Sequence, residues 1–113
     1  MVEMSKSELN ELESRICVII EHMLKLEHLP HLLLYNRRIW MGTINRERAD
    51  LFKLFDSHKP GLKPQINEVL VNKQYRDAAV EVSKQFPKHV FPRICPYAVE
   101  EVVGNEVFML LKR

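Results

Sequence analysis

The sequence predicts an all-α protein, a small bundle of three main helices followed by a short helix near the C-terminus. Two observations lead to this prediction. Apolar residues recur at steps of three and four along three long segments, which is the spacing of one helix face. Helix-breaking prolines separate these segments at Pro30, Pro60 and Pro87. A chain of 113 residues suits one modest core, so residues 1–113 are expected to form a single helical domain.

Residues 6–27 carry the clearest helical pattern. Ser5 and Glu8 have the spacing of a capping box, in which each side chain accepts a backbone N–H at the helix start. The apolar stripe is wide and consists of Leu9, Leu12, Ile16, Cys17, Val18, Ile19, Ile20, Met23, Leu24 and Leu26. Because little of the middle turns is left for water, this helix is expected to be the central one and to need partners on several sides.

A second helix is predicted at residues 36–57. Pro30 disfavours the α conformation at the residue before it, so residues 28–34 are expected to form a connector or an irregular turn. Asn36 is a suitable N-cap residue for the helix that follows. The apolar face of this helix includes Trp40, Ile44, Leu51, Leu54 and Phe55.

A third helix is predicted at residues 63–86. It follows a break at residues 58–61, where proline and glycine are adjacent. Pro64 suits the first turn of a helix, and Pro87 marks its end.

The C-terminal quarter is expected to contain one short helix, at residues 97–103. Residues 87–96 hold three prolines with Val90, Phe91 and Ile94 between them, which predicts an ordered extended connector pinned by its apolar side chains. Residues 105–113 are apolar for a terminus, so this tail is expected to dock on other parts of the protein.

Composition favours a soluble cytoplasmic protein. No apolar run approaches the ~20 residues that cross a bilayer, and no secretory signal is visible, so no membrane association is expected. Cys17 and Cys95 lie in unrelated contexts and are expected to be reduced thiols. With 17 basic and 15 acidic side chains, the net charge of +2 does not by itself indicate nucleic-acid binding.

Several motifs resemble the bacterial domain-of-unknown-function family 29, which is mostly cyanobacterial. The matching blocks are residues 11–16 (ELESRI) leading into 22–25 (HMLK), 40–44 (WMGTI) with Arg48, 75–78 (YRDA), and 91–97 (FPRICPY). The resemblance implies an all-helical fold and assigns no activity. Family members usually carry a further helical stretch before the first block, so this chain is expected to be short at its N-terminus, with the surface under that stretch covered by something else.

Three histidines are candidate metal ligands, namely His22, His28 and His31. The last two have a His-x-x-His spacing, but Pro30 interrupts the unbroken helix on which two imidazoles could share one ion. Ordinary polar or partly buried histidines are the favoured interpretation, and His22 is expected to form a hydrogen bond in the core. A metal-dependent enzyme that uses His22 is the less favoured alternative.

Arg37, Arg38, Arg46 and Arg48 surround Trp40 and form the best basic cluster. Arginine beside an aromatic ring suits phosphate contacts and base stacking, so nucleic-acid or anion binding is one interpretation. A solvated helix face, with the tryptophan as a core anchor, is the favoured interpretation.

No catalytic residue or cofactor is predicted. The three glycines are far apart, so no phosphate-binding loop can be built from them. Cys95 and His89 are a conceivable nucleophile pair, but the prolines around them favour a structural role.

The favoured function is a non-catalytic helical protein-interaction or assembly domain, because apolar surface is in surplus and convergent polar groups are few. The first helix and the tail 105–113 together offer more apolar surface than two other long helices can cover. The chain is therefore expected to form a homodimer, and an unidentified protein partner is a further option.

Overall fold

The computed structural model describes residues 5–57 and 63–112. These two ranges contain helices and no strand, which confirms the predicted all-α class. The predicted break at residues 58–61 lies outside the described residues. In chain order the elements are α1 (Lys6–His28), the 3-10 turn η1 (Pro30–Leu32), α2 (Leu33–Ser57), α4 (Glu68–Gln85), α5 (Val99–Val103) and α6 (Asn105–Leu111).

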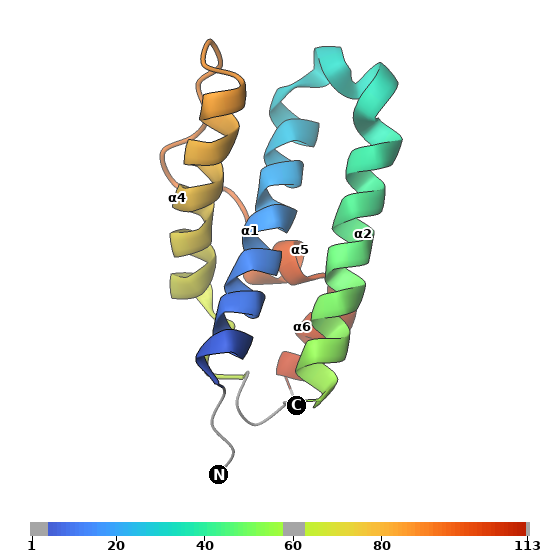
Figure 1. Cartoon of the computed structure of the whole chain (residues 1–113), viewed down its shortest axis with the longest axis vertical. Coiled ribbons are helices and arrows are strands. Elements are labelled where there is room, and N and C mark those ends of the chain that lie inside the picture. Colours follow the sequence, from blue (N-terminus) through green and yellow to red (C-terminus); the bar gives the residue numbers. More distant parts are fainter. Residues whose placement is uncertain (1–4, 58–62, 113) are drawn as a thin grey trace.

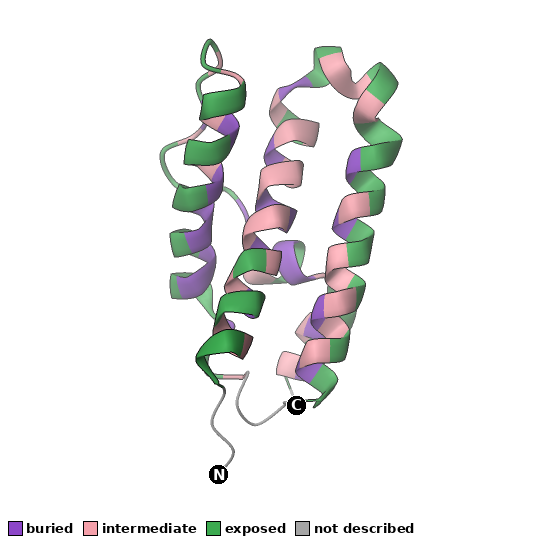
Figure 2. Cartoon of the chain, in the orientation of Figure 1, coloured by how far each residue is buried: buried purple, intermediate pink, exposed green. Residues whose placement is uncertain are grey.

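Helix α1 is the central element, as its wide apolar stripe predicted. It lies between α2 and α4, and the short helices α5 and α6 lie behind this layer (Figure 1). Five of its side chains are fully buried, namely Leu12, Ile16, Ile19, Ile20 and Leu24. Burying each of these side chains stabilises the fold by roughly 1.5–3 kcal/mol. Figure 2 shows the buried positions on the sides of the three long helices that face one another.

The start of α1 confirms the predicted capping box. The hydroxyl of Ser5 accepts the backbone N–H of Glu8 at 3.1 Å, and the carboxylate of Glu8 accepts the backbone N–H of Ser5 at 3.0 Å. Two donors that have no partner within the helix are thereby satisfied.

Helix α2 begins at Leu33, so the predicted start at Asn36 is wrong. Pro30 occupies the first position of η1, where a missing N–H has no cost, and this turn continues directly into α2. Asn36 lies inside the helix, and its side-chain amide donates to the carbonyl of Leu32 at 3.0 Å. The 3-10 turn at 30–32 agrees with the expected irregular turn, but α2 has already begun at Leu33, within the range expected to connect the helices.

Helix α4 begins at Glu68, five residues after the predicted start at 63. The N-cap is Asn67, whose side-chain oxygen accepts the backbone N–H of Leu70 at 3.0 Å. Pro64 lies in the preceding turn, and its carbonyl accepts from the side chain of Asn67 at 2.9 Å. An N-cap that satisfies two polar groups determines where this helix begins.

The segment 87–96 is ordered without being a helix, as predicted, but only part of the predicted anchoring is correct. Phe91 is buried, whereas Val90 and Ile94 are 87% and 83% exposed. The second anchor is the hydroxyl of Tyr75, which donates to the carbonyl of Pro92. The buried ring of Phe91 and the hydrogen bond from Tyr75 are therefore among the contacts that hold this connector.

The predicted helix at 97–103 is present as α5, two residues shorter at its start, and the tail forms the additional helix α6. The sequence-based count of one short helix is thus wrong by one. Val107 and Leu110 of α6 are buried, and α6 packs on α2, so the tail docks as expected. No helix in the described ranges combines the length and the apolar content that a bilayer crossing requires.

Candidate functional site

Three of the four arginines predicted as a cluster are exposed on α2. They are Arg37, Arg38 and Arg46. Among residues 5–57 and 63–112, none of them has a hydrogen-bond or ion-pair partner. Three guanidinium groups are therefore available to a ligand on one half of this helix.

Arg48, the fourth arginine, is occupied within the fold. Its guanidinium donates to the backbone carbonyls of Val102, at 3.1 Å, and Glu101 at the end of α5. Burial lowers the pKa of Arg48 from its ordinary value. Its side chain also fills the space beside Gly104, where a Cβ atom would lie 3.0 Å from the Cδ of Arg48. Arg48 thus ties α2 to α5 and does not join the exposed arginines.

Trp40 is a core anchor and not an exposed stacking platform. Its side chain is only 8% exposed. The ammonium group of Lys25 lies 5.8 Å from the centre of the indole ring. The arginine-aromatic arrangement that suggested base stacking is therefore absent at this position.

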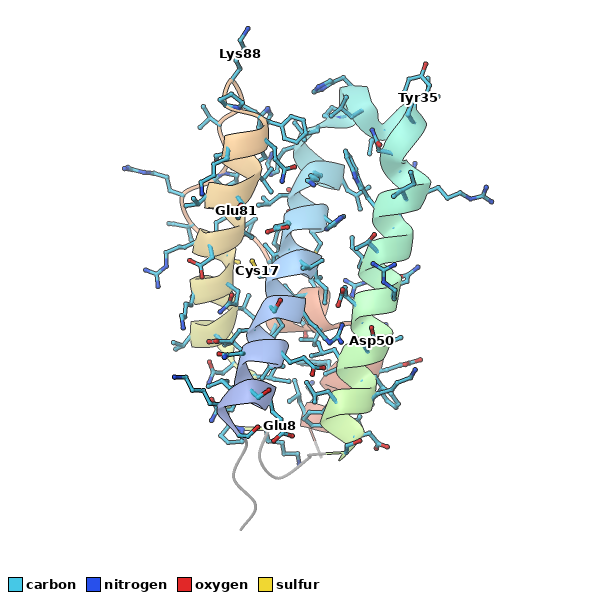
Figure 3. All side chains as sticks on the ribbon, in the orientation of Figure 1. Glu8, Cys17, Tyr35, Asp50, Glu81 and Lys88 are labelled. Carbon is cyan, nitrogen blue, oxygen red and sulfur yellow. The ribbon has the colours of Figure 1, made fainter. Side chains whose placement is uncertain are left out.

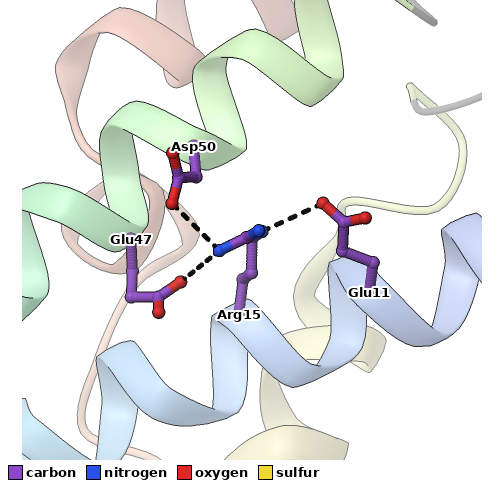
Figure 4. Close-up of polar contacts among 4 residues, drawn as sticks. All are labelled: Glu11, Arg15, Glu47 and Asp50. Atoms are coloured by element: carbon purple, nitrogen blue, oxygen red, sulfur yellow. Dashed lines mark hydrogen bonds and ion pairs between the residues drawn. The ribbon is translucent and has the colours of Figure 1, made fainter.

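The acidic residues that interleave with the arginines are bound by α1. Arg15 contacts Glu47 at 2.7 Å, Asp50 at 3.1 Å and Glu11 of its own helix at 3.1 Å (Figure 4). Burial acts to lower the pKa of Arg15, but the hydrogen bonds that Arg15 donates to Glu47 and Glu11, together with the negative charges of Glu47 and Asp50, outweigh it, and the pKa is raised. The two carboxylates that follow Arg46 in the sequence, Glu47 and Asp50, are therefore paired with Arg15.

Large apolar side chains are also exposed on the first half of α2, close to Arg37, Arg38 and Arg46 in the sequence. Leu34 is 83%, Tyr35 81%, Ile39 64% and Met41 41% exposed. Tyr35 projects from the upper end of α2 into solvent (Figure 3). Steps of three, four and seven place these side chains with two arginines and a glycine on one side of the helix. We define this outer face as Leu34, Tyr35, Arg38, Ile39, Met41, Gly42 and Arg46.

The two candidate histidines with His-x-x-His spacing have different surroundings. His28 ends α1 and packs against His89 and Phe91, with ring centres 5.8 Å and 5.6 Å apart, and the sequence did not indicate this cluster. His31 is exposed in η1 and lines a surface hollow. The other residues of this hollow are Leu29, Gln85, Phe86, Pro87, Lys88 and His89.

His22 is partly buried, and its hydrogen bond is made within its own helix. Its Nδ1 lies 2.8 Å from the carbonyl of Val18, one turn earlier in α1. Within the described residues, no group of three histidine, cysteine, aspartate or glutamate side chains is arranged to hold a metal ion.

The family model described as "Domain of unknown function DUF29" matches residues 1–108, which is nearly the whole chain. This chain belongs to the DUF29 family. No curated protein and no solved structure matches it. The family resemblance seen in the sequence is therefore confirmed, and it brings no assigned activity with it.

Two of the blocks that carry the DUF29 resemblance meet in the core. Tyr75, from the third block, donates its hydroxyl to Pro92 of the fourth, and its ring lies 6.4 Å from the ring of Tyr97. Burial, and next the carboxylate of Glu27, raise the pKa of the Tyr97 hydroxyl, while burial raises that of Tyr75. Both phenols are therefore neutral structural groups at physiological pH.

The two cysteines of this DUF29 chain are free thiols in apolar surroundings. Burial, together with the nearby Glu21, raises the pKa of Cys17 to about 12. Cys95 donates to the carbonyl of Tyr97 at 3.5 Å, and burial raises its pKa as well. A thiol with a raised pKa is a poor nucleophile, which favours a structural role for both.

The sequence did not identify the outer face because the predicted helix began too late. With a predicted start at Asn36, Leu34 fell in the expected connecting segment and Tyr35 fell outside the helix, and Ile39 was not recognised as exposed. The spacing of Tyr35, Ile39 and Arg46 was the available signal, because these positions share one side of a helix that begins at Leu33.

Proposed function

We propose that this DUF29 chain is a non-catalytic helical interaction domain that binds another protein through the outer face of α2. The observation that carries the proposal is the exposure of Leu34, Tyr35 and Ile39 beside arginines that the fold does not use. Monomeric proteins rarely expose contiguous patches of large apolar side chains, and arginine and aromatic residues are enriched in protein interfaces.

The free thiols of Cys17 and Cys95 and the bacterial distribution implied by the family resemblance support a setting in a bacterial cytoplasm. In that setting residues 1–113 would act as one domain, because a single core draws side chains from all five α-helices of the described ranges.

Co-purification from the source cells tests the proposal. Tagged wild-type chain, Ile39→Glu and Val69→Glu would be recovered in parallel and the bound proteins quantified. Val69 is 76% exposed on α4 and is the matched control for placing a charge on an exposed apolar position. A bound protein should be retained by wild type and Val69→Glu and lost from Ile39→Glu. Equal recovery with all three, or no bound protein with wild type, would contradict the proposal.

Self-association as a homodimer is a second proposal. It is motivated by the number of apolar side chains in the sequence, and the same variants test it. Sedimentation equilibrium over a concentration series would reveal a homodimer, and its loss in Ile39→Glu alone would assign the outer face to a second copy. A 13.4 kDa monomer at high concentration would exclude the homodimer.

Nucleic-acid binding is the third candidate, and the exposed Arg37, Arg38 and Arg46 favour it. Its test is a salt-dependent shift of oligonucleotides that disappears when Arg37 and Arg38 become alanine. The burial of Trp40 removes the stacking ring that this interpretation used, so protein binding has the stronger support.

A further inference from the structure

The outer face of α2 has the form of a ridge that another helix can approach closely. Gly42 lies at its middle, and a Cβ atom added there would meet nothing within 4 Å. Glycine inside a helix costs about 0.5–1 kcal/mol relative to alanine, and no contact within the described residues requires it here. The exposed apolar side chains lie on both sides of this low point, at the three- and four-residue spacings that pack into the grooves of a second helix.

The charge on this ridge selects an acidic occupant. Residues 33–46 contain three arginines and no aspartate or glutamate. The carboxylates that follow, Glu47 and Asp50, are held by Arg15. An anionic partner would gain ion pairs along the whole ridge at no cost to contacts that the fold already uses.

A second copy of the chain does not meet this requirement. Arg38 and Arg46 lie four residues before and four residues after Gly42, so two-fold antiparallel pairing centred on Gly42 would set Arg38 of one copy against Arg46 of the other, and like charges would meet. The phosphates of nucleic acid could pair with the arginines. The four exposed apolar side chains, however, would pack better against the apolar stripe of a helix than against a phosphate backbone.

We infer that the occupant of the outer face is an amphipathic helix of a partner protein, with an apolar stripe that packs across Gly42 and acidic residues that pair with Arg38 and Arg46. This inference rests on the proposed interaction role and names the partner's chemistry. Recognition follows the helix-in-groove mode, in which apolar residues at i, i+3, i+4 and i+7 anchor the helix and flanking charges fix its register.

Selection from a displayed library of helical peptides tests the inference. The library would hold peptides of about 18 residues, or about five turns, with randomised apolar and charged positions. The baits would be the wild-type chain, Gly42→Leu, and the double variant Arg38→Glu with Arg46→Glu. All substituted positions are exposed, and leucine is a better helix former than glycine, so each bait should fold. Circular dichroism and urea unfolding would verify this.

Wild type should enrich acidic helices with an apolar stripe. These helices should bind Gly42→Leu more weakly by about tenfold or more, because the added side chain blocks close approach. The double variant should enrich basic helices. Enrichment of neutral or basic helices by wild type, affinity unchanged by Gly42→Leu, or tighter binding of anionic vesicles or oligonucleotides than of any helix would overturn the inference.

The two proposals fail in different ways. If co-purification depends on Ile39 but wild type enriches no acidic helix, the interaction role stands and the helical occupant is wrong. If wild type enriches acidic helices but co-purification does not depend on Ile39, the interaction role in the cell is wrong.

Discussion

The two halves of α2 differ in how much the rest of the fold uses them. In residues 47–57 the side chains hold the bundle together, since Glu47 and Asp50 bind Arg15, Arg48 binds α5, and Leu51 and Phe55 are fully buried. In residues 33–46 only Trp40 and Ile44 are buried, and the exposed arginines have no partner within the described ranges.

This contrast separates structure from function within one continuous helix. The second half is explained by folding, because its side chains bind Arg15 of α1 and the end of α5 and bury two apolar residues in the core. The first half retains apolar and cationic side chains that the fold does not use, and such a surplus indicates an interaction. Matched substitutions in the two halves therefore test whether this difference holds.

The largest difference is expected between two aromatic residues. Phe55→Ala removes a ring that is 0% exposed and should lower the free energy of unfolding by about 3–5 kcal/mol. Tyr35→Ala removes a ring that is 81% exposed and should change it by less than about 0.5 kcal/mol. Urea unfolding followed by circular dichroism measures both. Similar losses for the two variants would mean that the halves are equally structural.

A second pair compares two arginines. Arg48→Ala removes two hydrogen bonds to the end of α5 and should cost about 1.5–3 kcal/mol. Arg38→Ala removes an exposed charge without a partner in the described ranges and should cost less than about 0.5 kcal/mol. Thermal unfolding is a suitable measurement, and a destabilised Arg38→Ala would show that this side chain belongs to the fold.

A third pair compares two glycines. Gly42 belongs to the first half of α2, and Gly104 lies against Arg48 of the second half. Gly104 has φ of 86° and lies against Arg48, so Gly104→Ala should destabilise by about 1–3 kcal/mol. Gly42 lies in open space within a helix, and Gly42→Ala should stabilise by roughly 0.5–1 kcal/mol. If Gly42→Ala is destabilising instead, the glycine has a packing role in the isolated chain.

The smallest effect concerns the ion pairs that hold the second half to α1. Arg15→Met should lower the free energy of unfolding by about 1 kcal/mol at low salt, because Glu47 and Asp50 lose their partner. The difference from wild type should shrink in about 1 M salt, where charges are screened within about 3 Å. Arg46→Met is the control and should show little change at either salt concentration.

Most of the fold followed from the sequence because helix periodicity is a strong local signal. The wide stripe of 6–27 identified the central helix, and the Ser5 capping box fixed its start. The start of α2 was missed because the 3-10 turn that begins at Pro30 continues directly into it, and the start of α4 was missed because Asn67, and not Pro64, caps that helix. Helix α6 was missed because its seven residues are held by packing on α2 and not by a long periodic pattern.

The candidate site was predictable only in part. The basic character of 37–46 was evident in the sequence, but exposure depends on tertiary contacts. Nothing local indicates that Arg48 reaches the carbonyls of α5, which are more than fifty residues away along the chain, or that Arg15 binds Glu47 and Asp50. Long-range pairing of this kind decides which charges remain for a partner.

Site-specific photo-crosslinking in the source cells would show whether the first half of α2 contacts a partner protein. A photoreactive amino acid would replace Ile39 in the first half of α2 or Lys53, also exposed, in the second half. The proposed interaction role predicts a covalent adduct with a partner protein from position 39, on an acidic amphipathic helix, and none from position 53. Adducts of equal yield from both positions, or none from position 39, would contradict it.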